Sequence, residues 1–352
     1  MNILVTGGAG FIGSHTVVAL AKAGFTPIIL DDFSNSDRRV LKGLEQILGY
    51  KPRCHAENCC DPKVLPWVFR EEKIDGVIHF AAFKSVGESM QEPIKYYGNN
   101  VSSLIVLIDN MLRAGIPNLI FSSSATVYGE PETLPVTEQS PVPPAMSVYG
   151  NTKQIGEEIM RDTAAAGKPL KAISLRYFNP IGAHPSAHIG ELPIGVPNNL
   201  VPFITQTAAG VRPELTVFGN DYPTADGTCL RDYLHVMDLA EAHVAAMQFL
   251  LQKPETSLYD LFNVGTGQAA SVLELIKIFE EISGRPLNYR IGDRRPGDVT
   301  AVYADVSKIA AELGWKAKRS MRTALEDAWR WQQQLSLNQK LEFGNGRRFS
   351  GN

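Results

Sequence analysis

The sequence of 352 residues has a formal net charge of −3, with 44% hydrophobic and 20% charged residues, which is the composition of a globular protein with a sizeable core. Its length suggests two domains, or one large α/β domain with a substantial insertion, and the lack of a long basic block excludes nucleic acid as a partner. No apolar run reaches about 18 residues and the first residues already resemble a strand, so we expect no membrane span, no signal peptide and a cytoplasmic protein.

The N-terminal segment predicts a βαβ unit. Residues 2–6 form a short apolar strand, a glycine-rich turn follows at residues 7–13, and a helical pattern continues to Ala23. Gly24 is suited to end that helix, and residues 27–31 form the next strand. A strand, a glycine-rich turn, a helix and a second strand in this order are the context in which a dinucleotide-binding turn is found.

The glycines of this turn, Gly7, Gly10 and Gly13, recur every third residue. Glycine permits the tight turn and the close approach of the backbone to a pyrophosphate, and the N-terminus of the following helix attracts the same anion. Asp31 and Asp32 end the second strand, where a carboxylate can accept hydrogen bonds from the hydroxyls of the adenosine ribose. Because a carboxylate there repels a 2′-phosphate, we predict NAD rather than NADP.

Alternation of strands and helices continues, with further strands predicted at residues 51–57, 74–80, 118–123 and 171–177. In an open parallel sheet, ligands bind beyond the carboxyl ends of the strands. Segments with small, polar or charged residues lie at five such ends: residues 7–13, Asp31, Ala81–Lys84, Ser122–Thr126 and Tyr177–Asn179. We therefore expect the functional site at this edge of the sheet.

A long helix is predicted at residues 93–115. Its apolar residues are Ile94, Tyr97, Val101, Leu104, Ile105, Val106, Leu107, Ile108, Met111 and Leu112. They occupy more than one face, which indicates burial against the sheet and against something else. Two interpretations remain open: an interior helix, or a contact surface in a homodimer.

Tyr149 and Lys153 lie four residues apart in a predicted helix at residues 147–166, and so share one face. A tyrosine hydroxyl has a reference pKa near 10 and is a poor base at neutral pH unless a cation stabilises its phenolate. Lys153 can supply that cation, and a hydroxyl from Ser122–Thr126 can relay the proton. By itself the pair is equally compatible with a solvated pair on a helix surface.

The pattern changes after about residue 180. Residues 181–235 are rich in Pro, Gly and Asn, as is typical of a substrate-binding insertion. Further elements are helices at residues 237–251, 271–283 and 320–335, a strand at 259–264 that returns to the main sheet, a charged loop at 290–298 and a frayed polar end at 342–352. The predicted domains are residues 1–180 (with returning segments near 237–265), residues 181–335, and a polar tail at 336–352.

The cysteines are Cys54, Cys59, Cys60 and Cys229. They form no Cys-x-x-Cys pair and have no metal-ligand spacing, and the adjacent Cys59 and Cys60 could bridge each other only with strain. We expect four reduced thiols and no metal site.

Several motifs join the glycine turn and the Tyr149/Lys153 pair: Ile78-His79-Phe80-Ala81, Phe121-Ser122-Ser123-Ser124-Ala125-Thr126-Val127-Tyr128-Gly129, Arg176-Tyr177-Phe178-Asn179-Pro180, Pro197-Asn198-Asn199-Leu200, Phe218-Gly219-Asn220-Asp221-Tyr222 and Arg231-Asp232-Tyr233-Leu234-His235-Val236. Together they resemble the extended short-chain dehydrogenase/reductase family, and within it the branch that epimerises UDP-hexoses at C4. The resemblance covers residues 2–335. It implies a Rossmann-type doubly wound parallel sheet with a smaller C-terminal substrate-binding α/β domain.

The resemblance also implies the reaction: reversible C4 epimerisation of UDP-glucose and UDP-galactose, through a 4-keto intermediate and transient reduction of a tightly bound NAD. Tyr149 would take the proton of the 4-hydroxyl, and Ser124 would hydrogen-bond the 4-oxygen. Lys153 would lower the pKa of Tyr149 and bind the nicotinamide ribose. The UDP would stay anchored while the keto sugar turns.

The residues expected to contact NAD are Gly7, Gly10, Phe11, Ile12, Gly13, Asp31, Asp32, Phe33, Ser34, Asn35, Ser36, Asn58, Cys59, Phe80, Ala81, Ala82, Phe83, Lys84, Asn99, Ser124, Tyr149, Lys153, Tyr177 and Phe178. Those expected to contact the UDP-sugar are Lys84, Ser124, Tyr149, Asn179, Asn199, Leu200, Thr216, Val217, Phe218, Arg231, Tyr233, Arg295, Asp298 and Val302. Arginine suits the diphosphate because its guanidinium binds oxyanions with two parallel hydrogen bonds. His79 is interpreted as a core residue with a hydrogen-bond partner.

Three positions depart from the family's pattern. Asn58 stands where an Asp near the adenine amino group is usual, and its amide oxygen can still accept from that group. Ala82 stands where a glycine is frequent. At the position of Val302, a bulky Tyr goes with restriction to UDP-glucose and UDP-galactose, and a small residue with acceptance of N-acetylated sugars, so we predict room for a 2-acetamido group.

Two alternative functions have less support in the sequence. A related dehydratase or decarboxylase is the nearer one, but a dehydratase needs an Asp-Glu pair where Ala125-Thr126 follow Ser124. A catalytically silent NAD-binding protein would be expected to lack Tyr149, Lys153 or the hydroxyl cluster, all of which are present.

Overall fold

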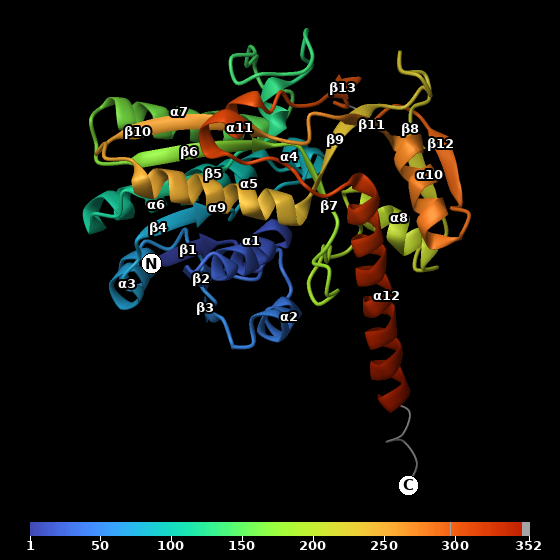
Figure 1. Ribbon diagram of the computed structural model, residues 1–352, viewed down its shortest axis with the longest axis horizontal. Coiled ribbons are helices and arrows are strands. Elements are labelled where there is room, and N and C mark those ends of the chain that lie inside the picture. Colours follow the sequence, from blue (N-terminus) through green and yellow to red (C-terminus); the bar gives the residue numbers. More distant parts are fainter. Residues whose placement is uncertain (296, 347–352) are drawn as a thin grey trace.

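The structure, a computed structural model, describes residues 1–295 and 297–346 (Figure 1). Its centre is a seven-stranded sheet in which every neighbouring pair of strands is parallel. The strand order is β10 (Leu258–Val264), β6 (Lys171–Tyr177), β5 (Asn118–Ser122), β4 (Gly76–His79), β1 (Asn2–Thr6), β2 (Thr26–Leu30) and β3 (Arg53–His55). The chain runs outward from β1 to β3 and then crosses to β4 on the other side of β1, as in a doubly wound sheet.

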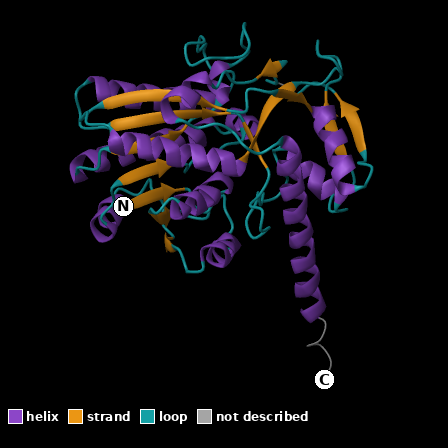
Figure 2. Ribbon diagram, in the orientation of Figure 1, coloured by secondary structure: helices purple, strands orange, loops and turns teal. Residues whose placement is uncertain are grey.

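Helices cover both faces of this sheet (Figure 2). Helices α1 (Phe11–Lys22), α2 (Arg39–Leu48), α9 (Val236–Gln252) and α11 (Ser307–Leu313) contribute to the core on one face. Helices α3 (Val64–Glu72), α6 (Ser102–Ala114) and α7 (Val148–Ala165) contribute to the core on the other. No helix of the described residues is long and apolar enough to cross a membrane.

The strands are apolar on both sides because both sides are covered. In β1, Ile3 and Val5 belong to the core beneath α1 and α9, whereas Leu4 belongs to the core beneath α3 and α6. Residues 119–121 of β5 alternate between the two cores in the same way. Successive side chains of a strand point to opposite faces, so continuous apolar runs are expected in a sheet that is buried on both sides.

A second group of elements lies beyond one end of the sheet and has its own core. Strand β9 (Leu230–His235) pairs with β11 (Ala269–Ser271), β13 (Ala301–Val302) and β7 (Asn179–Ile181), and β8 (Leu215–Phe218) pairs with β12 (Tyr289–Gly292). Helices α8 (Leu200–Ala208), α10 (Val272–Ser283) and α12 (Met321–Gly346) contribute to this core. The division of the chain into domains at residue 180 stays a prediction.

Most predicted elements are present, and the strand at 259–264 does return to the main sheet, as β10. The prediction of one helix at residues 93–115 is wrong in its detail. The segment consists of α5 (Pro93–Tyr96), a π-helical turn (Tyr97–Val101) and α6. The interior-helix interpretation is also wrong, because Ile94 and Ile105 are exposed. The first residues of the predicted charged loop at 290–298 belong to β12, which ends at Gly292. A strand this short carries little sequence signal.

The last helix extends to Gly346, past its predicted end at residue 335, because helix-forming residues continue there. Residues 342–346 of the predicted frayed end are therefore helical, and residues 347–352 lie outside the described residues.

Three histidines are buried in the sheet and its covering helices: His15, His79 and His243. His79 Nδ1 lies 2.7 Å from the Thr6 hydroxyl, which confirms it as a core residue with a hydrogen-bond partner. Burial lowers the pKa of His15 and of His79 to about 3, and that of His243 to about 4. In the unfolded chain the same groups titrate near pH 6.5, so the stability they contribute is present above that pH and is lost as the pH falls towards 3–4.

We predict that His243→Asn makes the protein less sensitive to acid. His243 Nδ1 lies 2.9 Å from the Leu239 carbonyl, to which an asparagine amide can still donate. With one buried imidazole removed, the fall in the free energy of unfolding between pH 6 and pH 5 should be shallower by about 1 kcal/mol. Urea unfolding at pH 7.5, 6 and 5 measures this, and His188→Asn, which replaces an exposed histidine, serves as the matched control.

Candidate active site

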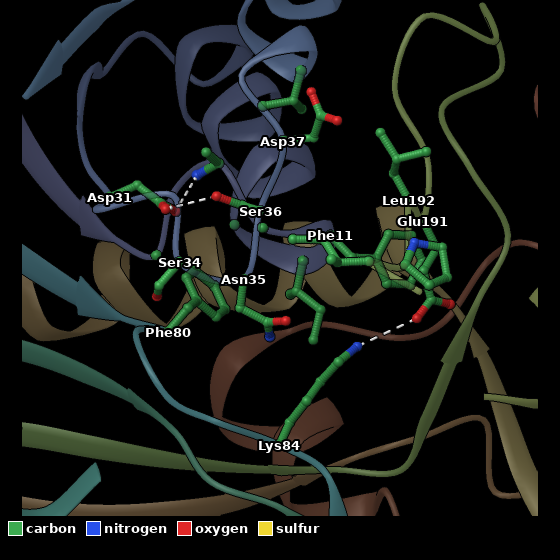
Figure 3. Close-up of a pocket in the computed structure, with 18 of the residues that line it drawn as sticks. Phe11, Asp31, Ser34, Asn35, Ser36, Asp37, Phe80, Lys84, Glu191 and Leu192 are labelled. Atoms are coloured by element: carbon green, nitrogen blue, oxygen red, sulfur yellow. Dashed lines mark hydrogen bonds and ion pairs between the residues drawn. The ribbon is translucent and has the colours of Figure 1, made fainter. Parts of the chain in front are cut away.

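One cavity of about 1070 Å³ lies at the carboxyl edge of the main sheet and extends to the second group of elements. Its lining comes from the turns after β1, β2 and β4, from α7 and from a loop and a helix of the second group. Figure 3 shows labelled residues from the turns and from that loop. The expected residues that line it are Gly7, Gly10, Phe11, Ile12, Gly13, Asp31, Asp32, Ser34, Asn35, Ser36, Asn58, Cys59, Phe80, Ala81, Ala82, Phe83, Lys84, Asn99, Tyr149, Lys153, Tyr177, Asn199 and Arg295. These residues meet at the edge of the sheet where the sequence predicts them.

The glycine turn has no room for side chains. A Cβ on Gly13 would lie 2.2 Å from the Gly7 carbonyl oxygen, and one on Gly7 would lie 2.8 Å from the Ala81 nitrogen. Gly7 also has a φ of 69°, which favours glycine. Gly10 caps α1 without a side-chain hydrogen bond, so the first N–H groups of this helix face the cavity edge as an anion site. This turn fits the pyrophosphate of a dinucleotide.

Asp31 at the end of β2 is buried and holds the neighbouring turns in place. One carboxylate oxygen accepts from the Phe33 N–H at 2.9 Å and from the Ser36 hydroxyl at 2.7 Å, and the other accepts from the Ala9 N–H at 2.9 Å. Figure 3 shows Asp31 facing Ser36 at this end of the cavity. Since each oxygen can accept two hydrogen bonds, the second one retains capacity for a ribose hydroxyl.

The π-helical turn carries two asparagines, and the Asn99 amide nitrogen donates to the Asn100 oxygen at 3.0 Å. Asn99 lines the cavity, while Asn100 is buried and bonds the backbone of Phe83 twice, through its oxygen and through its nitrogen, each at 2.9 Å. The same nitrogen donates to the Thr152 hydroxyl of α7 at 3.2 Å. Through Asn100 the π turn ties the segment after β4 to the helix that carries Tyr149.

Helix α7 begins at Ser147, whose hydroxyl accepts from the Gly150 N–H, and it brings Tyr149 and Lys153 to the cavity together. Lys153 Nζ donates to the Ser122 carbonyl at 2.7 Å and lies 5.7 Å from the centre of the Tyr149 ring. The Ser122 hydroxyl donates to the Tyr177 hydroxyl at 2.8 Å. Ser122 therefore organises both neighbours of the tyrosine, although sequence analysis selected Ser124 alone from this cluster.

The pKa of the Tyr149 hydroxyl lies above its usual value. Burial and the neighbouring Tyr177 raise it, and a hydrogen bond with Ser124 opposes them in part. Burial lowers the pKa of Lys153 to about 8, and the charge of Glu157 acts in the opposite direction. That Lys153 lowers the pKa of Tyr149 stays a prediction.

A buried ion pair fixes α7 to the sheet one turn beyond Lys153. Arg176 of β6 donates to both oxygens of Glu157, at 2.9 and 2.5 Å, and the Ser123 hydroxyl donates to the same carboxylate at 2.5 Å. All three side chains are buried. Removing one partner from such a pair leaves an uncompensated charge, so this contact holds the register of α7 against β5 and β6.

The remaining expected residues do not line the cavity: Phe33, Ser124, Phe178, Asn179, Leu200, Thr216, Val217, Phe218, Arg231, Tyr233, Asp298 and Val302. Val217 and Tyr233 are buried in the core of the second group, and Arg231 pairs with Asp298 at 3.4 Å. Val302 and Phe178 pack together in a small apolar cluster. Their roles as ligand contacts stay predictions.

The loop that closes the other side of the cavity lies in the predicted insertion at residues 181–235, but sequence analysis selected none of its residues. Residues 187–194 line it, and so does Trp331 of α12. Within this loop Glu191 forms an ion pair with Lys84 at 3.3 Å, which Figure 3 shows across the cavity. A Pro- and Gly-rich loop has no periodicity, so only its length and the single carboxylate could have drawn attention to it.

Comparisons with known proteins agree with this geometry. The family model described as GDP-mannose 4,6 dehydratase matches residues 4–328. A UDP-glucose 4-epimerase of Neisseria meningitidis is 51% identical over 330 residues, which are 94% of this chain and 96% of that protein.

Two solved structures are also similar. One, of a UDP-glucose 4-epimerase from Stenotrophomonas maltophila with bound NAD and formylated UDP-arabinopyranose, has a TM-score of 0.93 and 47% identity, and covers 96% of this chain and 99% of that one. The other, from Bifidobacterium longum in complex with NAD+ and UDP, has a TM-score of 0.91 and 44% identity, and covers 95% of this chain and 98% of that one.

Proposed function

The chain belongs to the UDP-glucose 4-epimerases, a group of NAD-dependent enzymes within the extended short-chain dehydrogenase/reductase family, and from this premise we propose that it interconverts UDP-glucose and UDP-galactose. The observation that carries the proposal is a cavity that joins the glycine turn, the Tyr149/Lys153 pair and Asn199. A dinucleotide and a nucleotide sugar can meet there at one tyrosine.

The residues present fit NAD. The crowded glycine turn and the N-terminus of α1 suit its pyrophosphate, and Asp31 has a free acceptor for its ribose. NAD supplies the hydride acceptor and donor for the sugar C4 when it is bound. NAD is in the same oxidation state at the start and the end of each turnover, so the enzyme does not need to exchange it. We therefore expect NAD to be retained through purification.

The protein's own groups handle the proton. Tyr149 takes the proton of the sugar 4-hydroxyl and returns it to the same oxygen, with Ser124 in hydrogen bond with the phenol. Because burial raises the pKa of Tyr149, the phenolate needs positive charge nearby. We assign this role to Lys153 together with the positively charged nicotinamide, since Tyr149 and Lys153 are buried and charges interact strongly there.

The substrate's nucleotide is held by the second group of elements. We propose contacts from Asn199, Arg231 and Arg295, with the N-terminus of α8 facing the diphosphate. Anchoring at the nucleotide leaves the hexose free to turn, so that either face of C4 can meet the cofactor.

A dehydratase activity, which the description of the family model would suggest, has less support. Ala125 and Thr126 follow Ser124 in a short 3-10 helix (Ala125–Tyr128), where the chemistry of dehydration needs a carboxylic acid and a carboxylate.

The proposal predicts that Tyr149→Phe loses activity while the fold is kept. Phenylalanine preserves the ring but has no hydroxyl, so turnover of UDP-galactose should fall by about a thousandfold. The assay follows the formation of UDP-glucose without added NAD. The thermal midpoint and the NAD content of the variant serve as controls and should match those of the unsubstituted protein.

Absence of turnover in the unsubstituted protein, even with NAD supplied, would instead support a silent NAD-binding protein. Turnover retained by Tyr149→Phe would remove the tyrosine from the mechanism.

We further propose that the enzyme accepts N-acetylated sugars because Val302 is small. Val302 packs with Phe178 and Tyr128, and a larger side chain at this position would have to leave that cluster. Val302→Tyr should therefore abolish turnover of UDP-N-acetylgalactosamine and retain that of UDP-galactose. If the unsubstituted protein converts UDP-galactose and not UDP-N-acetylgalactosamine, the hypothesis that Val302 leaves room for a 2-acetamido group is wrong and the epimerase mechanism is unaffected.

A homodimer is proposed from the exposed apolar side chains of α4 (Val86–Gln91), α5 and α6. Met90, Ile94 and Ile105 are 59%, 81% and 50% exposed, which is unusual for large apolar side chains on neighbouring helices. A second copy of the chain is the occupant we propose for this face. Sedimentation should give twice the chain mass for the unsubstituted protein and the chain mass for Ile94→Glu/Ile105→Glu, whereas an unchanged mass would contradict it.

The reaction is proposed to take place in the cytoplasm. All four cysteines are free, and Cys59 lines the cofactor end of the cavity, where oxidation would disturb binding. Reduced thiols persist in that compartment.

A further inference from the structure

Glu191 joins the two walls of the cavity. Lys84, which follows β4, donates to Glu191 Oε1 at 3.3 Å, and Asn199, which precedes α8, donates to the same oxygen at 2.5 Å. Figure 3 shows the Lys84 and Glu191 side chains pointing toward each other across the space between these walls. One oxygen thus links a residue expected at the cofactor to one expected at the nucleotide of the substrate.

The backbone around Glu191 is held by the C-terminal helix. The Trp331 indole N–H of α12 donates to the Glu191 carbonyl at 2.9 Å. Gly190 packs directly on the same indole, where a Cβ would lie 2.5 Å from the ring. The carboxylate is itself only 12% exposed. Its position is therefore set by the fold.

Asn199 occupies the N-cap position of α8 and does not cap it. Asparagine is among the preferred N-cap residues because its side-chain oxygen accepts from the N–H groups of the first turn. Here the amide is turned to Glu191, and the N–H groups of Leu200 and Val201 receive no side-chain cap. Pro202, the third residue, has no N–H.

The carboxylate determines which way this amide faces. The Asn199 nitrogen must point to Glu191, because the opposite orientation would bring the amide oxygen against a negatively charged oxygen. An Asn199 side chain released from this contact can return to the helix end and occupy its first free N–H groups. Those same groups attract an anion when they are left open.

We propose that Glu191 is a positioning residue for nucleotide binding, which keeps Asn199 off the N-terminus of α8 and so reserves that helix end for the diphosphate of the UDP-sugar. The inference rests on the proposed function for the identity of the nucleotide. It assigns no contact between Glu191 and the ligand, and a carboxylate beside a diphosphate would otherwise only oppose binding.

The test is the affinity of the NAD-loaded protein for UDP, measured by calorimetry. Glu191→Ala frees Asn199 to cap α8 and should weaken UDP binding about tenfold. Glu191→Gln still offers an oxygen to the Asn199 amide and should stay within about threefold of the unsubstituted protein. Glu255→Ala removes an exposed carboxylate elsewhere and controls for the change in net charge.

The decisive comparison is made in an Asn199→Ala background. Without an amide to hold, Glu191→Ala should have no further effect on UDP affinity, so the two substitutions should be strongly non-additive. A merely structural role for Glu191 would weaken binding equally in both backgrounds, and glutamine would not restore it. Equal losses in both backgrounds, or a Glu191→Ala protein that binds UDP as the unsubstituted protein does, would overturn the proposal.

The same measurements separate this inference from the proposed function. If the unsubstituted protein binds no UDP, the proposed function fails. If it binds UDP and only the predicted pattern among the variants is absent, the role of Glu191 alone is wrong.

Discussion

The parallel direction of all seven central strands is the constraint on which the site depends. Because every strand of the sheet points the same way, the glycine turn, Asp31, the segment after β4 and the serine cluster all leave the sheet at one edge. None of these segments carries a complete site. The crossing from β3 back to β4 opens the space between them, and the second group of elements closes it from the other side.

Hydrogen bonds fix the positions of the charged side chains at this edge of the sheet. The Glu157–Arg176 pair and the Ser123 hydroxyl fix α7 below Lys153, and the Ser122 carbonyl fixes the ammonium above it. Lowering the pKa of a lysine from 10.5 to about 8 corresponds to about 3 kcal/mol of cost for its charged form, so the cation is retained at neutral pH against considerable burial. Burial acts on Tyr149 in the opposite sense, because it keeps the hydroxyl protonated.

Much of the fold followed from local pattern, and the reasons are physical. Strands covered on both faces are continuous apolar runs, and a glycine turn between a strand and a helix is typical of a dinucleotide-binding edge. The Tyr149/Lys153 pair could be placed because four residues make about one turn of helix. Local pattern could not supply the π turn from which Asn100 reaches Thr152 of α7, or the choice of Ser122 over Ser124 as the residue that holds Lys153 and Tyr177. Those outcomes depend on contacts between segments far apart in the sequence.

The substrate side of the cavity illustrates the same limit most clearly. Asparagine is a common N-cap residue, but the partner of Asn199 is Glu191, whose backbone carbonyl accepts from an indole of α12 more than a hundred residues later in the chain. A side-chain N-cap contributes about 1 kcal/mol to helix stability. The charge-assisted hydrogen bond with the largely buried Glu191 carboxylate replaces that cap here. The first N–H groups of α8 are left without a side-chain cap, and unpaired donors at a helix N-terminus attract anions. Binding sites of this kind arise where the fold prevents a residue from taking its most common local role.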